Sequence, residues 1–82
     1  MESQLTLDEL ERIAAVRRLC GSGLAAQIRT AARLTLEDVA RVVGTTATSV
    51  WRWENGERTP RAGAALKLAE IYGRLIDDEA AA

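Results

Sequence analysis

The chain has 82 residues, of which 48% are hydrophobic and 28% charged, and its net charge is −1. This length is sufficient for one small domain with a modest core, so we expect a single domain over residues 1–82. The chain contains no histidine and one cysteine, Cys20. That composition excludes the usual zinc sites, histidine-based catalytic triads and an internal disulfide. We therefore expect no catalytic residue, no metal and no cofactor, and a reducing, cytoplasmic environment.

Positive charge is concentrated in the middle of the chain. Residues 1–11 carry a charge of −4, and residues 68–82 carry a charge of −3. Between them, residues 12–67 hold ten basic and four acidic side chains, which gives a local charge of +6. Such a segment suits a polyanionic partner such as nucleic acid. Ordinary solvated helix faces give the same distribution, so both interpretations stay open at this point.

The first predicted helix covers residues 7–20. Thr6 and Glu9 have the spacing of a capping box, and Gly21 is expected to end the helix in a left-handed conformation. Residues 1–4 are polar and acidic, unlike a signal peptide, and no apolar run approaches the roughly 20 residues of a membrane span. The helix has an apolar surplus that leaves two roles open, covering one side of the core or pairing with a second chain. The residues of that surplus are Leu7, Leu10, Val16 and Leu19.

Four more helices are predicted, because apolar residues recur at helical spacing between capping residues and glycines. They lie at about 23–32, 36–43, 46–54 and 60–76. Thr35 and Thr46 are the expected caps of the third and fourth helices, and Pro60 is expected in the first turn of the fifth. The acidic tail, residues 77–82, is expected to fray. The fold class is therefore all-α, with a core at about 24–72.

The third and fourth predicted helices form a helix-turn-helix pattern, in which two short helices are joined by about three residues that begin with glycine. Ala40 is small enough to let the second helix approach closely. Gly44 can adopt positive φ, and Val50 can fill the angle between the two helices. These three residues occupy relative positions 5, 9 and 15 of such a unit.

The predicted helix at 46–54 presents two different sides. At about 100° per residue, Val50 and Trp53 share one side, which we expect to be buried. The opposite side carries Thr48 and Arg52, with Trp51 beside them. An exposed tryptophan next to an arginine indicates a contact surface. The alternative interpretation is that Trp51 folds back over the neighbouring helix.

The stretch LTLEDVARVVGTTATSVWRWENGERTP, residues 34–60, resembles the helix-turn-helix of the phage repressor/Cro family, also called the Xre family. The resemblance covers about residues 24–72, where LKLAEIY is similar to the closing helix of that family. The residues that carry it are Leu34, Thr35, Val39, Ala40, Gly44, Thr46, Val50, Trp53, Glu54, Gly56 and Pro60. It implies a five-helix, lambda-repressor-like domain that binds double-stranded DNA with the helix at 46–54 in the major groove.

The resemblance also implies roles for individual residues. Those expected at base edges are Ala47, Thr48 and Arg52. Arg52 is the first candidate, because bidentate pairing of arginine with guanine is the commonest specific contact. Those expected at the DNA backbone are Arg33, Thr35, Thr46, Ser49, Trp51, Asn55, Arg58 and Arg61. Arg29 and Glu54 are expected to form a structural ion pair that orients the recognition helix more than it stabilises the fold.

These expectations describe a sequence-specific transcriptional regulator, a small prokaryotic or phage repressor of the Cro type. We expect it in the prokaryotic cytosol, associated with the nucleoid, as a homodimer on a palindromic operator. The alternative is an antitoxin-like regulator of the same fold that binds a protein partner through its N-terminal helix. Two departures from the family bear on this choice. Leu36 stands where the family commonly has a phosphate-contacting glutamine, and the helix at 7–20 is an addition.

Overall fold

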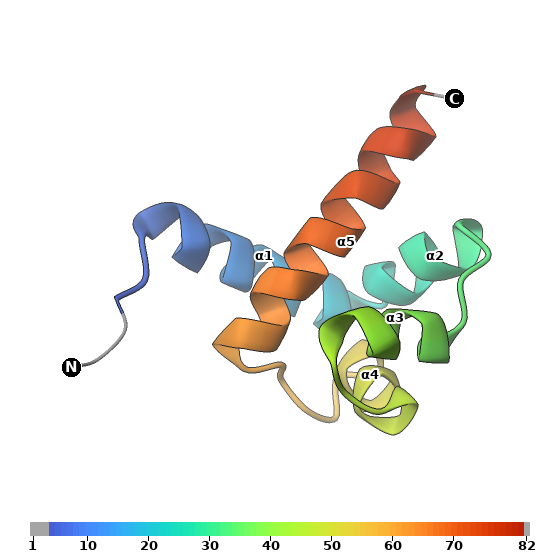
Figure 1. The fold of residues 1–82 in the computed structure, drawn as a ribbon, viewed down its shortest axis with the longest axis horizontal. Coiled ribbons are helices and arrows are strands. Elements are labelled where there is room, and N and C mark those ends of the chain that lie inside the picture. Colours follow the sequence, from blue (N-terminus) through green and yellow to red (C-terminus); the bar gives the residue numbers. More distant parts are fainter. Residues whose placement is uncertain (1–3, 82) are drawn as a thin grey trace.

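Five α-helices make up most of the chain in the computed structural model, which describes residues 4–81 (Figure 1). They are α1 (Leu7–Ser22), α2 (Leu24–Ala31), α3 (Leu36–Val43), α4 (Ala47–Glu54) and α5 (Ala62–Ala81). No strand occurs between residues 4 and 81, and the all-α class expected from the sequence is confirmed. None of the five helices described is long and apolar enough to cross a membrane. The expectations for residues 1–3 and for residue 82 lie outside the described residues.

α5 is the longest helix and holds the others together. It crosses α1 in the view of Figure 1, and it also packs against α2 and α3. α3 and α4 pack on each other, and α1 reaches α4 as well as α2. The added N-terminal helix is therefore built into the body of the molecule.

The core is small and rich in valine and alanine, because the chain has no phenylalanine and several of its leucines, among them Leu7, Leu10 and Leu24, are exposed. Its buried apolar residues are Ile13, Val16, Cys20, Ala25, Val39, Ala40, Val43, Val50, Ala65, Leu68 and Tyr72. α1 contributes to this core through its C-terminal half, whereas Leu7 and Leu10 in its first turns are exposed. Trp53, which the sequence placed in the core, packs against the core and is only partly buried.

A capping box begins α1, as the sequence predicts, and a second one begins α3, where Thr35 is the expected cap. Thr6 N donates to Glu9 Oε1 at 2.9 Å, and Glu9 N donates to Thr6 Oγ1 at 3.1 Å. At α3, Thr35 N donates to Asp38 Oδ2 at 2.8 Å, and Asp38 N donates to Thr35 Oγ1 at 3.0 Å. The backbone N–H of Thr35 holds the pKa of the Asp38 carboxyl below its ordinary value. Each box satisfies two of the N–H groups that a helix start leaves without partners.

The end of α1 differs from the expectation by two residues. The helix continues through Gly21 and Ser22, and Gly23 is the residue with positive φ, +88°. The expectation of that conformation at Gly21 is therefore wrong. Because α2 starts at Leu24, the chain must reverse at one residue, and of the two glycines only Gly23 is directly before that start.

Both ends of α5 also differ from the expectation. The helix begins at Ala62, so Pro60 precedes it and does not lie in its first turn. Arg61 occupies the capping position, where its carbonyl oxygen accepts from Ala65 N at 2.8 Å. At the other end, residues 77–81 are helical, so the helix extends beyond the expected end at residue 76. Alanine has the highest helix propensity, and Ala80 shares an apolar groove with α2, which explains the continuation.

Cys20 is expected to be almost unreactive in the native protein. Its thiol is buried beside Tyr72, and burial, with a smaller contribution from the nearby Glu54 carboxylate, raises the pKa of the thiol to about 11. Because only the thiolate is nucleophilic, we expect a thiol reagent at pH 8 to label the native chain roughly 100-fold more slowly than the unfolded chain. Labelling rates with and without denaturant measure this ratio, and equal rates would contradict a buried thiol.

Candidate nucleic-acid interface

The turn between α3 and α4 is made by Gly44. Its φ is +87°, and its N–H donates to the Ala40 carbonyl at 2.8 Å, where Thr45 N also donates at 2.9 Å. Ala40 is buried beneath the turn, and the side chain of Val50 is fully buried between the helices. Small residue, glycine and branched residue thus occupy the positions that a helix-turn-helix requires. The turn fixes α4 relative to the rest of the core.

α4 exposes one side and buries the other. Val50 is buried and Trp53 partly so, whereas Thr48 and Arg52 are exposed. Trp51 is 45% exposed, so nearly half of its surface is open to a ligand. Ala47 lies between the two sides and is partly buried. The side of α4 that faces away from Val50 is therefore available to a ligand.

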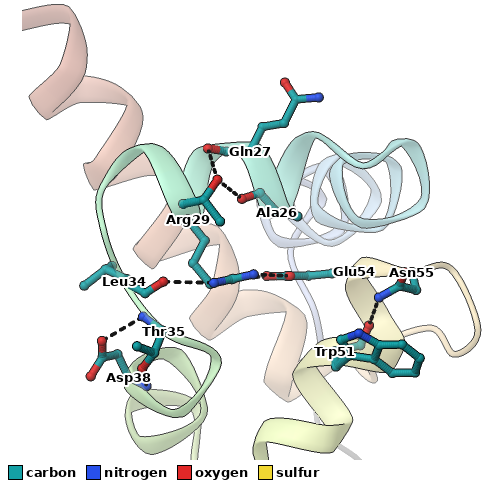
Figure 2. A network of polar contacts seen from close by, with 10 residues as sticks. Ala26, Gln27, Arg29, Leu34, Thr35, Asp38, Trp51, Glu54 and Asn55 are labelled. Carbon is teal, nitrogen blue, oxygen red and sulfur yellow. Dashed lines mark hydrogen bonds and ion pairs between the residues drawn. The ribbon is translucent and has the colours of Figure 1, made fainter.

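Both ends of α4 are closed by side chains. Thr46 Oγ1 accepts from Ser49 N at 3.1 Å, and its hydroxyl lies 3.1 Å from Ser49 Oγ. At the other end, Asn55 Nδ2 donates to the Trp51 carbonyl at 2.8 Å (Figure 2). One amide N–H of Asn55 is used in this way, and the second is free to meet a ligand.

Four cationic side chains line one groove beside α4. Arg52 comes from α4, Arg58 and Arg61 from the segment between α4 and α5, and Lys67 from α5. We call this the basic groove. Its other polar side chains are the hydroxyls of Thr45, Ser49 and Thr59. Hydroxyl groups and cationic side chains donate hydrogen bonds to phosphate oxygens, and here they converge on one open surface.

Arg29 links three elements next to the end of α4 (Figure 2). Its Nε donates to Glu54 Oε2 at 2.8 Å and its Nη2 to Glu54 Oε1 at 2.9 Å, so the pair is bidentate. Its Nη1 donates to the Leu34 carbonyl at 2.9 Å. The Arg29 and Glu54 side chains are only 13% and 3% exposed, and hydrogen bonding to Glu54 raises the pKa of Arg29. The end of α4 is thereby tied to α2 and to the segment before α3.

Of the eight backbone-contact candidates, Ser49, Arg58 and Arg61 line the basic groove and the other five do not. Arg33 and Thr35 lie at the turn between α2 and α3, and neither lines the groove. Arg33 is exposed and adopts a left-handed conformation with φ +62°, so it also serves as a turn residue. Leu36, which replaces the glutamine common in the family, packs against the core, and its side chain offers no hydrogen-bond donor.

Three hydroxyl or ammonium side chains of the groove were not predicted from the sequence, and Lys67 is the most informative of them. Its Nζ donates to the Val43 carbonyl at 3.3 Å, so it also satisfies an acceptor at the end of α3. Thr45 and Thr59 are the other two. Lys67 is the one lysine in the chain, but its place beside α3 depends on how α5 packs. The described residues hold no cluster of three or more side chains suited to a metal ion.

Two short helices, a glycine turn and an exposed second helix beside a basic groove define an all-α helix-turn-helix protein. The family model described as Helix-turn-helix domain matches residues 22–82, and the chain belongs to that family. This agrees with the resemblance noted in the sequence, and it indicates a DNA-binding regulator. No curated protein and no solved structure matches the chain. Nearly all of α1 lies outside the matched residues.

Proposed function

We propose that the protein is a sequence-specific regulator of transcription, a small prokaryotic repressor of the Cro type that acts in the cytoplasm on nucleoid DNA. In this proposal the whole chain is one DNA-binding domain, and it binds without chemistry or cofactor. The observation that carries the proposal is the position of Arg52. Its side chain is exposed on α4 and also lines the groove that Arg58, Arg61 and Lys67 make basic.

In this proposal one group of residues contacts the bases and another contacts the phosphates. Ala47, Thr48 and Arg52 contact base edges in the major groove, where an α-helix can be accommodated. The phosphate contacts come from the residues that surround them, which fix the register of the protein on the duplex. These residues are Arg33, Thr35, Thr46, Ser49, Trp51, Asn55, Arg58, Arg61 and, added here, Lys67.

Selection from a random pool of duplexes is the direct test. We expect one sequence to be enriched, and its affinity to fall steeply with salt, by about 0.9 in logarithmic slope for each phosphate contacted. Fluorescence anisotropy titrations of the selected duplex and of a scrambled duplex at several salt concentrations measure both properties. Failure to enrich any sequence, with equal affinity for both duplexes, would reject sequence-specific binding.

The size of the molecule supports a homodimer on a palindromic site. Its extents are 41 × 29 × 22 Å. Half-sites one helical turn apart place two bound copies at about 34–36 Å between centres, so neighbouring copies touch if their longest axes run along the line between the centres. We expect two copies on a palindrome with positive cooperativity. A single half-site should bind one copy with lower affinity, and identical affinities on both duplexes would argue against the dimer.

A second candidate function, antitoxin-like binding of a protein partner, is favoured by the start of α1. Leu5, Leu7 and Leu10 are all exposed there, and Leu7 has 79% of its surface accessible. Exposed apolar residues close together on a small protein indicate a contact with another protein. If the purified chain binds no duplex until a second protein is added, and Leu7→Glu with Leu10→Glu abolishes that binding, this second function replaces the first.

A further inference from the structure

Arg17 makes a contact between α1 and a distant part of the chain. Its Nε and Nη2 both donate to the carbonyl oxygen of Pro60, at 3.2 and 3.1 Å. Pro60 belongs to the segment between α4 and α5, residues 55–61, which we call the arginine segment because it carries Arg58 and Arg61. Arg17 itself lies outside the residues matched by the helix-turn-helix family. A helix added to the domain is thus bonded to the segment that follows the recognition helix.

Backbone hydrogen bonds hold the arginine segment mainly at its two ends. Gly56 N, Glu57 N and Arg58 N donate back to carbonyls of α4 at 3.1, 2.9 and 3.4 Å, and the Arg61 carbonyl accepts from α5 at 2.8 Å. Between these ends Pro60 has no N–H to donate. Its ring is buried, and its carbonyl takes both hydrogen bonds from Arg17. The guanidinium is therefore the polar contact that fixes the second half of the segment.

Fixing Pro60 limits the positions open to both arginines of the segment, since Arg61 is its neighbour and Arg58 lies two residues before it. Both side chains line the basic groove. A segment that is ordered before binding loses less conformational entropy when its side chains meet a ligand. We propose that Arg17 is a positioning residue, which holds the arginine segment in the conformation in which Arg58 and Arg61 meet DNA phosphates. This inference rests on the proposed function, but the first of its two tests does not.

The first test measures the order of the arginine segment in the free protein. In the wild-type chain we expect backbone ¹⁵N order parameters of about 0.85 at Arg58, Thr59 and Arg61, as in rigid backbone, and values below about 0.6 in Arg17→Ala. Arg18→Ala is the matched control. It removes the same charge from the neighbouring position, and the exposed Arg18 guanidinium makes no hydrogen bond within residues 4–81. Equal order in wild type and Arg17→Ala would overturn the inference without touching the proposed function.

The second test measures DNA affinity and its salt dependence. We expect Arg17→Ala to bind every duplex about two- to tenfold more weakly, the scale of ordering one or two side chains on binding, with an unchanged salt slope. Arg18→Ala should bind within about twofold of wild type. A salt slope reduced by about 0.9 in Arg17→Ala would show that Arg17 itself contacts a phosphate, and that outcome overturns a positioning role.

A third variant tests whether Arg17→Ala weakens binding only because the fold is less stable. Val16→Ala removes a fully buried side chain of the same helix and leaves Arg17 in place. Below the melting temperature of all variants, Val16→Ala should keep wild-type order in the arginine segment and wild-type DNA affinity. If Val16→Ala and Arg17→Ala weaken binding equally, Arg17 only stabilises the fold, and the inference is wrong. If wild-type protein binds no duplex, the proposed function fails and the first test alone decides on Arg17.

Discussion

Replacement of Arg52 by alanine is expected to weaken binding to the selected DNA site about 10- to 100-fold, because one bidentate arginine–guanine pair contributes about 1–3 kcal/mol of discrimination. Arg52 is exposed on the side of α4 opposite Val50, and few of its atoms pack in the core. The variant should therefore keep its melting temperature. We expect preference to relax at one base pair, which titrations of the selected site and its single-base variants measure.

Arg58→Ala is the matched comparison, because Arg58 lines the same basic groove from outside α4. Loss of a phosphate contact weakens binding evenly across sequences and lowers the salt slope by about 1. The two arginines then differ in kind: one variant changes which base is preferred, and the other changes only how tightly any duplex is held. If both substitutions affect every sequence alike, the division between base and phosphate contacts is wrong.

Local chemistry explains why the helix-turn-helix was predictable from the sequence. The capping interactions, the glycine turn and the apolar spacing of α3 and α4 each act over three or four residues. α3 has the expected bounds, and α4 begins one residue later than expected and ends at the expected residue. The orientation of α4 follows from the same periodicity, since Val50 is buried and Arg52 exposed. Arg29 and Glu54 were paired by resemblance, and the structure brings them within hydrogen-bonding distance.

Contacts between distant residues explain what the sequence analysis did not find. Lys67 reaches the carbonyl of a residue 24 positions earlier, and Arg17 bonds Pro60 across 43 positions. Both contacts exist only because α5 and α1 pack across the helix-turn-helix. The start of α5 was misplaced for a related reason. Pro60 has the signature of a first helical turn, but it is buried in the segment before the helix, where its carbonyl is held by α1.

Replacement of Glu54 by alanine should produce the largest loss of stability. Arg29 would keep its buried position with its charge unpaired, and breaking a buried pair in this way costs about 3–5 kcal/mol. The free energy of unfolding of a small domain is about 5–15 kcal/mol in total, so this loss is a large part of it. The melting temperature should therefore fall by tens of degrees. Because Arg29 also bonds the Leu34 carbonyl, the end of α4 would lose its link to α2 and to the start of α3. Thermal and urea unfolding measure the loss.

Two control variants test whether Glu54→Ala loses stability because it leaves the buried charge of Arg29 unpaired. Glu70→Ala breaks the Glu70–Arg74 pair of similar length, 2.9 Å, whose side chains are 66% and 77% exposed, and it should change stability by less than about 1 kcal/mol. Removing both buried partners, Arg29→Met with Glu54→Leu, should recover much of the stability lost by Glu54→Ala, because no charge is then left unpaired.

At temperatures where Glu54→Ala is still folded, we expect weaker binding to all duplexes, since α4 is no longer held in place. A variant that melts like wild type and loses only its sequence preference would assign Glu54 to base contact and not to the orientation of α4.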